Sequence, residues 1–466
     1  MDDSDSDPMT FIKYKGFDHL WKYTGPWLWW LLGLYFWLPV LAYIVLPYFT
    51  SKRRFSKKKS ATLFVLGDIG HSPRMCYHAR SLAKLDYYVT LCGYLETFPP
   101  EDIVDDENID IQSIDPIRNT LGLPFIAFAA QKIVLQCFQL FNLLVEYGCA
   151  DYIIIQNPPS IPILILAIIY KKLLSRDTQI VIDWHNLNYS ILNLKYQNEG
   201  HPLVRFLKSY EKYVGRWADH HITVTVQMKQ FLVKEFGLSS KRITTLHDRP
   251  AEGFEPLVSM GISQSEVLRN HELFESVGDE ISKYRILVSS TSFTPDEDFN
   301  VLLDALKMYD QDINLPPVLL VVTGKGPLKE QFHKRAEQLQ FSNRVIIKTA
   351  WLSFEDYPLI LAAADLAVSL HTSSSGIDLP MKIVDFFGCG VPVITMDFPA
   401  IGELVKDGVN GLVVKNKADP AQEIFRLLQE ALTNDELLPR ITNGALKESK
   451  LRWDENWDNN LGNYFK

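Results

Sequence analysis

The sequence has few cysteines and little clustered positive charge. Its five cysteines are odd in number and lack a Cys-x-x-Cys spacing, which is typical of buried small hydrophobes in a reducing compartment and argues against zinc. The formal net charge is −9 and the body of the chain has no long basic stripe, so nucleic acid is not an expected partner. At 466 residues and 47% hydrophobic content, the chain is long enough for two globular domains with additional segments.

Charge is also absent from residues 27–49, which are rich in aromatic and aliphatic side chains. As a helix this segment would be roughly 35 Å long, enough to cross the hydrocarbon core of a bilayer. An acidic tail over 1–26 precedes it and a basic flank over 50–59 follows it, so the positive-inside rule predicts a single transmembrane helix with the body in the cytosol. A cleaved signal peptide is the less favoured alternative, because the apolar run is too long and no small-residue cleavage site follows it.

Apolar runs of strand length alternate with helix-length segments through the rest of the chain, which predicts two doubly wound α/β domains with parallel sheets. We expect the first domain over 60–250, a polar linker over 251–284, the second domain over 285–435 and a helical segment over 436–466. The expected strands are Thr62–Leu66, Tyr88–Tyr94, Ile109–Ile114, Tyr152–Ile155, Ile180–Asp183, His221–Val224, Ile243–Leu246, Arg285–Ser289, Val318–Thr323, Val345–Lys348, Leu366–Leu370, Val393–Met396 and Leu412–Val414.

The most informative stretch is 371–392, which reads HTSSSGIDLPMKIVDFFGCGVP and follows a predicted strand. Small hydroxyl residues and a glycine ahead of a helix predict outward backbone N–H groups that favour a diphosphate at the positive end of the helix dipole. Lys382 lies in the first turn of that helix, and Asp385 follows on the same face, where a carboxylate suits the two hydroxyls of a ribose. The spacing fits a nucleotide-diphosphate clamp and an ordinary capped surface helix about equally.

In the first domain, a Gly-rich turn follows the first predicted strand. Gly67 and Gly70 permit a tight turn, Asp68 and His71 are each able to act as a base, and Arg74 is suited to holding a phosphate. A purely structural turn is the alternative interpretation.

A second motif, Asp183-Trp184-His185-Asn186, ends another predicted strand. Because ligands of such sheets bind beyond the carboxyl ends of the strands, His185 is a candidate to contact sugar or diphosphate, with a core histidine as the alternative.

These motifs resemble those of the chitobiosyldiphosphodolichol β-mannosyltransferase family. The resemblance rests on SLHTSSSGIDLPMKIVDFFGCGVPVI together with GDIGHSPRM, IDWHNLNYS, HDRP, STSFTPDEDF and TGKGP, which follow the family's order over most of the chain. It implies a GT-B glycosyltransferase fold, in which two Rossmann-like domains face a cleft and a terminal helical segment returns to the first domain.

The resemblance also implies an activity. The family transfers mannose from GDP-mannose to N,N'-diacetylchitobiosyl-diphosphodolichol with inversion, forming a β-1,4 linkage at the endoplasmic reticulum membrane during assembly of the lipid-linked precursor of protein N-glycosylation. Two alternatives stay open: a transferase that uses another nucleotide sugar, and an inactive GT-B-like scaffold for other transferases of the pathway. The GT-B pattern of retaining relatives, with Glu eight residues before the ribose-binding acid, is missing here, which fits inversion.

On this basis we predict the following roles. The expected donor contacts are Ser373, Ser374, Ser375, Gly376, Asp378, Lys382, Asp385, Gly324 and Lys325, and the expected acceptor contacts are Gly67, Gly70, His71 and Arg74. We expect Asp68, ahead of His185, to be the general base, although His71 stands where many family members have Arg. Backbone N–H groups and Lys382 would meet the charge of the leaving diphosphate, so the chemistry requires no metal or cofactor, and dependence on a divalent cation stays open.

Two strongly apolar stretches, Leu121–Tyr147 and Ile161–Tyr170, have alternative interpretations. Both suit buried helices, since the second is too short to span a bilayer. The alternative is an interfacial face through which the domain meets a polyisoprenoid substrate.

Overall fold

The computed structural model describes residues 27, 30–38, 41, 45 and 58–466, apart from 296, 343 and 354 and the side chains of 125, 126 and 129. The predicted tail and about half of the predicted membrane-spanning segment lie outside these residues, and 30–38 are helical. Among the helices that the structure describes, none combines the length and the apolar character needed to cross a bilayer.

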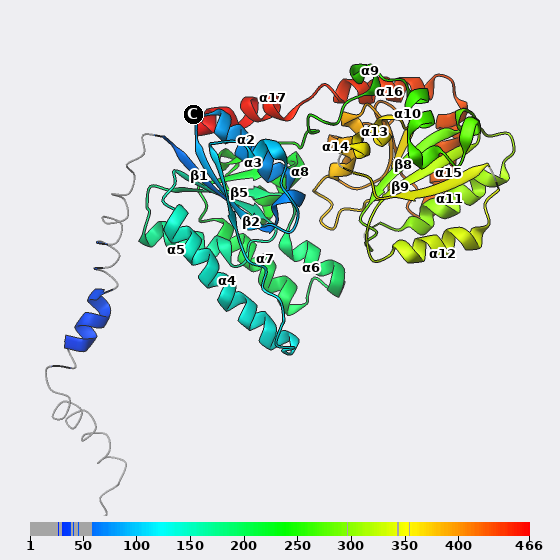
Figure 1. The fold of residues 1–466 in the computed structure, drawn as a ribbon. Helices are drawn as coiled ribbons and strands as arrows, with labels where there is room; N and C mark the ends of the chain where they lie inside the picture. The colour runs from blue at the N-terminus through cyan, green and yellow to red at the C-terminus, as the bar shows by residue number, and fades with distance from the viewer. Residues whose placement is uncertain are drawn as a thin grey trace, which may run out of the picture.

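The first domain is built on a parallel sheet of strand order β3-β2-β1-β4-β5-β6-β7 (Figure 1). Its strands are β1 (Ser60–Asp68), β2 (Tyr88–Tyr94), β3 (Ile109–Ser113), β4 (Tyr152–Asn157), β5 (Gln179–Trp184), β6 (His220–Thr223) and β7 (Ile243–Thr245). Its helices are η1 (Ile69–His71), α2 (Pro73–Lys84), α3 (Glu101–Val104), α4 (Phe125–Tyr147), α5 (Ile163–Leu173), α6 (Asn188–Tyr196), α7 (Pro202–Gly215), α8 (Val226–Phe236) and η2 (Ser240–Arg242).

The second domain has a parallel sheet of order β10-β9-β8-β11-β12-β13. Its strands are β8 (Arg285–Thr291), β9 (Val318–Gly324), β10 (Val345–Ala350), β11 (Leu366–Ser369), β12 (Val393–Met396) and β13 (Gly411–Val414). Its helices are α9 (Leu257–Met260), α10 (Gln264–Asn270), η3 (Glu272–Phe274), η4 (Gly278–Lys283), α11 (Phe299–Gln311), α12 (Lys329–Leu339), α13 (Asp356–Ala362), α14 (Met381–Gly388), η5 (Ile401–Glu403), α15 (Pro420–Thr433) and α16 (Leu437–Glu448).

The strands predicted from the sequence are all present, with ends that differ by two residues or fewer. Most of them are continuous apolar runs, as expected for parallel strands covered by helices. In the first sheet β4 lies between β1 and β5, so the loops that follow β1 and β5 leave the same edge about 10 Å apart. This topology brings the end of β1, where Asp68 lies, close to the loop after β5, which contains His185.

The segment 251–284 was predicted to be a linker, and the structure corrects this. Phe254, Leu257, Leu268 and Phe274 are buried in the core of the second domain. The segment is polar overall but supplies apolar side chains at intervals, so α9 and α10 pack on that core.

The chain returns to the first domain at its C-terminal end, through α17 (Trp453–Trp457), the π-helix η6 (Asp458–Gly462) and α18 (Asn463–Phe465) (Figure 1). The indole N–H groups of Trp453 and Trp457 donate to Ser81 Oγ and His78 Nδ1 of α2, each at 3.0 Å. These contacts tie the two domains together at the outer end of the molecule.

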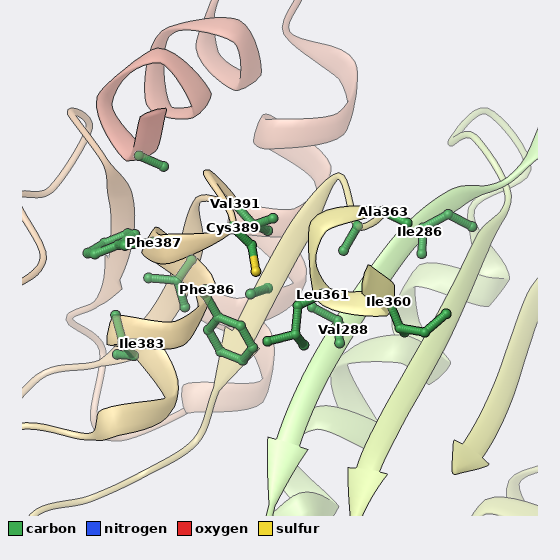
Figure 2. Packing of buried hydrophobic residues seen from close by; sticks show 14 of the residues in the cluster. Ile286, Val288, Ile360, Leu361, Ala363, Ile383, Phe386, Phe387, Cys389 and Val391 are labelled. Atoms are coloured by element: carbon green, nitrogen blue, oxygen red, sulfur yellow. The ribbon is translucent and has the colours of Figure 1, made fainter. Parts of the chain in front are cut away.

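A compact apolar core fixes the orientation of α14, the helix that follows the 371–380 loop. Ile383, Phe386 and Phe387 belong to one buried cluster with Val288 of β8 and Leu361 of α13. Figure 2 shows Phe386 directed toward Leu361. Val384 belongs to the same core, so α14 is packed on more than one side and its orientation is fixed.

Candidate active site at the domain junction

A buried carboxylate at the end of β5 organises the first half of the site. Asp183 accepts hydrogen bonds from Nε and Nη2 of Arg74, at 2.9 and 3.1 Å, and from Nε2 of His185 at 2.8 Å. Burial alone would raise the pKa of Asp183, but Arg74 and His185 hold it well below its ordinary value. The N–H at Nε2 of His185 therefore faces an anion, which leaves Nδ1 as the basic nitrogen of this partly exposed ring.

Arg74 is not available for the phosphate that the sequence predicted. Its side chain is 3% exposed, and Nη1 donates to the Leu246 carbonyl at 3.0 Å and to Asp248 at 2.6 Å in addition to the bonds with Asp183. A guanidinium so enclosed and paired is a structural clamp that holds β5, the end of β7 and α2 together.

Asp68 is also held within its own loop. Burial would raise its pKa, but hydrogen bonds from the Thr97 hydroxyl, His71 and the backbone N–H groups of Thr97 and Glu96 outweigh burial and lower it to about 2. Such a carboxylate is a weak base at neutral pH, so the geometry favours His185 over Asp68, reversing the order we expected. Gly70 is required here, because a Cβ would lie 2.4 Å from Thr97 Oγ1.

A buried acid holds the loop that carries His185 in place. Glu211 of α7 accepts hydrogen bonds from the Asn157 side chain, from the backbone N–H of Asn188 and from the Asn188 side chain, at 2.8 to 3.0 Å. Burial raises the pKa of Glu211. The acid caps the first turn of α6 and so fixes the backbone just after His185.

The loop before α14 has a different hydrogen-bonding pattern from the one predicted. Helix α14 begins only at Met381, and the hydroxyls of Ser373 and Ser375 turn inward to Asp378. The N–H of Gly376 donates to Ser373 Oγ at 2.7 Å. The prediction that the N–H of Gly376 points outward is therefore wrong. This N–H closes the loop by bonding to Ser373, and Asp378 accepts the hydroxyl bonds that hold the loop in shape.

Lys382 forms an ion pair within its own domain. Its Nζ lies 2.5 Å from Oε1 of Glu297, whose side chain is 1% exposed and whose Oε2 accepts from Thr291 at 2.5 Å. The Lys382 side chain is about one-quarter exposed and its ammonium has three donors, so a diphosphate would share it with Glu297.

Asp385 has an environment that the sequence did not indicate. Burial raises its pKa to about 8, with a further increase from Asp248 of the first domain and opposing effects of Tyr357 and Lys382. The predicted ionised carboxylate is thus mainly protonated at neutral pH in this arrangement, where it both donates and accepts hydrogen bonds.

The remaining donor candidates lie on the turn after β9. Gly324 has φ +146°, and a Cβ there would lie 1.8 Å from the Thr291 carbonyl, so only glycine fits. The exposed Lys325 stacks its ammonium over Trp351, 3.9 Å from the ring centroid. Among the described contacts of Lys325, none reaches the 371–380 loop.

The two halves of the site meet through direct contacts between the domains. Ser374 Oγ lies 3.3 Å from Asn186 Nδ2 and 3.2 Å from Ser190 Oγ. The Thr225 hydroxyl donates to the Ile377 carbonyl at 2.5 Å. The 371–380 loop therefore contacts Asn186, the residue that follows His185.

A second contact lies at the start of α8. Glu403 of the second domain accepts from the backbone N–H groups of Val226 and Gln227 and lies 2.8 Å from His247 Nε2. An acid at a helix N-terminus is stabilised by the helix dipole, so Glu403 fastens the two domains together.

Sequence reasoning missed the roles of Asp183, Glu297 and Glu403. Asp183 had a visible signal, since an acid that ends a continuous apolar strand needs a buried cation nearby. The partners of Glu297 and Glu403 are far away in the chain, and no local pattern marks them. Among the described residues, no group of three or more His, Cys, Asp or Glu side chains is arranged to hold a metal ion.

Two family models match the chain. Residues 70–248 match Glycosyltransferase Family 4, and residues 272–448 match Glycosyl transferases group 1. The first range begins just after β1 and contains β2 to β7, and the second contains all strands of the second sheet.

Full-length relatives are also found. A protein of Debaryomyces hansenii called chitobiosyldiphosphodolichol β-mannosyltransferase is 63% identical over 98% of both chains. Proteins of the same name from Candida albicans and Homo sapiens are 58% and 35% identical, over 98% and 92% of this chain and 98% and 96% of theirs.

Among solved structures, a glycosyltransferase of Rickettsia africae superimposes with a TM-score of 0.62 at 15% identity, covering 88% of this chain and 98% of its own. WaaG, a glycosyltransferase involved in lipopolysaccharide biosynthesis, gives 0.59 at 16% identity, covering 85% and 96%. These structures share the fold: two Rossmann-like domains in the GT-B arrangement.

Proposed function

The chain belongs to the chitobiosyldiphosphodolichol β-mannosyltransferase family and is a glycosyltransferase, and we propose that it transfers mannose from GDP-mannose to N,N'-diacetylchitobiosyl-diphosphodolichol with a β-1,4 linkage. The reaction belongs to the assembly of the lipid-linked oligosaccharide used in protein N-glycosylation. The donor sugar is α-linked to its diphosphate, so a β product requires direct displacement with inversion.

The contact between Asn186 and Ser374 supports the proposal most directly. It brings a histidine backed by a buried carboxylate to the loop that precedes Lys382 and Asp385. A base on one domain and a donor-binding loop on the other are what a displacement between two bound sugars needs.

In the proposed mechanism, Nδ1 of His185 takes the proton from the acceptor hydroxyl as its oxygen attacks the anomeric carbon of mannose. The bond from that carbon to the diphosphate breaks, and GDP leaves with the bonding electrons. Asp183 stabilises the imidazolium that forms, and Lys382 offsets the charge on the diphosphate. Asp385 holds the ribose hydroxyls of the donor.

The test is transfer of labelled mannose to lipid-diphosphate chitobiose by the purified full chain. His185→Gln keeps an N–H directed at Asp183 but removes the base, so we expect kcat to fall by about 10²- to 10⁴-fold with little change in KM for GDP-mannose. His333→Gln, on α12, is the matched control and should leave kcat unchanged.

The outcomes separate the alternatives. Product formed from another nucleotide sugar but not from GDP-mannose would identify a different donor. No product from any donor would favour an inactive scaffold for other transferases. Unchanged kcat in His185→Gln would remove His185 as the base.

We also propose that residues 27–49 anchor the chain once in the endoplasmic reticulum membrane with both domains in the cytosol, on the basis of their composition and flanking charges. A chain that begins at residue 58 should then be extracted from membranes by alkaline carbonate, whereas the full chain should require detergent. Equal extraction of both chains would contradict the anchor.

A further inference from the structure

Helix α4 exposes a stripe of apolar side chains to solvent. Its exposed stripe consists of Val134, Phe138, Phe141 and Val145, which are 41% to 67% exposed. On the protein side the helix buries Leu140 and Leu144 together with Gln136, whose amide donates to the Tyr94 hydroxyl at 2.9 Å. A surface helix in water normally has mainly polar residues on its outer side, whereas α4 is apolar on both sides.

Helices α5, α6 and α7 extend this surface. α4 packs on α5, α5 on α7 and α6 on α7, and the four lie together on one side of the first domain (Figure 1). Their outward apolar side chains are Ile165, Ile169, Leu173, Ile191, Leu194, Leu203, Phe206 and Tyr213, with Trp217 just after α7. An exposed apolar patch of this extent marks an interaction site.

Positive charges outnumber negative ones on this surface. Helices α5, α6 and α7 carry Lys171, Lys172, Lys195, Arg205, Lys208 and Lys212, and Arg216 follows directly. Glu211, the single acid of these three helices, is buried. On α4, Lys132 and Glu146 are both exposed, and Lys171 is paired with Asp219 at 2.5 Å. The ammonium of Lys172 lies 3.3 Å from the ring centroid of Trp217, so cations and aromatic rings are interleaved. The chain as a whole has a net charge of −9, so this basic surface is local.

We propose that the α4–α7 face, defined by the outward side chains of these four helices, rests on the surface of a lipid bilayer that contains anionic headgroups. Apolar and aromatic side chains would enter the headgroup boundary while the lysines and arginines meet phosphates. A second copy of this chain is a poorer occupant, because it would bring the same basic residues face to face.

The position of α6 gives this contact a consequence for catalysis, and this step rests on the proposed function. α6 begins at Asn188, three residues after His185, and exposes Ile191 and Leu194. A lipid-linked acceptor whose tail stays in the bilayer would thus present its sugar at the candidate base without leaving the membrane.

The experiment uses the full chain reconstituted into phosphatidylcholine vesicles with and without phosphatidylserine. An environment-sensitive fluorophore is attached to a cysteine introduced at Phe138, at Phe206 or, as the control, at Ile313. Ile313 is 77% exposed but lies in the second domain. Cys137 and Cys149 are replaced by Ala, and the other three cysteines are buried.

We expect blue-shifted emission and loss of fluorescence to lipid-borne quenchers at 138 and 206, more so with phosphatidylserine, and neither change at 313. Arg205→Glu with Lys212→Glu should remove the response to phosphatidylserine, whereas Lys334→Glu on α12 should not. Water-like emission at 138 and 206 in vesicles would overturn the proposal. So would a blue shift without vesicles that grows with protein concentration, which would identify a second copy.

This readout requires no sugar transfer. A chain that shows the fluorescence changes but makes no product would refute the proposed function alone, and the converse would refute the docking surface alone.

Discussion

Replacing Arg74 by Met tests whether this residue is a buried clamp or a phosphate ligand. The substitution keeps an unbranched side chain but leaves Asp183, which is fully buried, and Asp248, which is 9% exposed, without their cation. Breaking a buried ion pair from one side costs about 3–5 kcal/mol, which corresponds to roughly 10 °C in Tm for a domain of this size.

The assay is thermal unfolding of the purified full chain, together with steady-state kinetics. Lys84→Met is the matched control, because Lys84 lies on the same helix, is about half exposed and pairs with Asp454, which is 38% exposed. A surface pair of this kind contributes only about 0–1 kcal/mol. We therefore expect a large fall in Tm for Arg74→Met and almost none for Lys84→Met.

A second variant separates stability from catalysis. Adding Asp183→Asn to Arg74→Met removes the unpaired buried anion, so much of the lost stability should return. kcat should stay low, because His185 then lacks the carboxylate that orients it. The reasoning would be refuted by an Arg74→Met chain that melts like the native chain but has a raised KM for the lipid acceptor.

Three further predictions concern the second domain and its contact with the first. The pKa of Asp385 is raised from 3.8 to about 8, so the folded chain loses stability as pH rises between these values. Asp385→Asn should remove this loss, so the gain in stability measured by unfolding should be larger at about pH 8 than at about pH 5. The substitution should also weaken donor binding. Equal stability gains at both pH values would contradict the raised pKa. Lys382→Met should lower turnover and destabilise the domain by about 3 kcal/mol by leaving Glu297 unpaired, and adding Glu297→Gln should restore Tm but not kcat. Recovery of kcat would show that Lys382 has only a structural role. Glu403→Gln removes the anion from the start of α8 and should cost about 1 kcal/mol and enlarge the radius of gyration in small-angle scattering; an unchanged radius would mean that other contacts hold the domains together.

The fold was largely predictable because its signals are local. Parallel strands covered on both faces are continuous apolar runs, and they stand out between polar turns, as at Val318–Gly324. The linker was predicted wrongly because its buried side chains, such as Phe254 and Phe274, are scattered among polar residues without a period. These side chains come together only when the segment packs against the core of the second domain.

The candidate site was predictable in its motifs but not in the state of its side chains. Asp68 and Arg74 were both expected to meet ligands, yet one is a carboxylate held by its own loop and the other is sealed between Asp183 and Asp248. Availability depends on burial and on partners more than a hundred residues away, such as Asp183 for Arg74. Residue type and spacing do not identify those partners.

The sequence by itself determined the two α/β domains, their strands and the two motifs that meet at the junction, because hydrophobic periodicity and turn residues act over short distances along the chain. Only the tertiary structure decided which acid lies behind His185, that Lys382 is paired with Glu297, and that α4 faces outward with its phenylalanines. Those outcomes depend on which surfaces become neighbours when the helices pack on the sheets, and the free energy of that packing is shared among residues far apart in sequence.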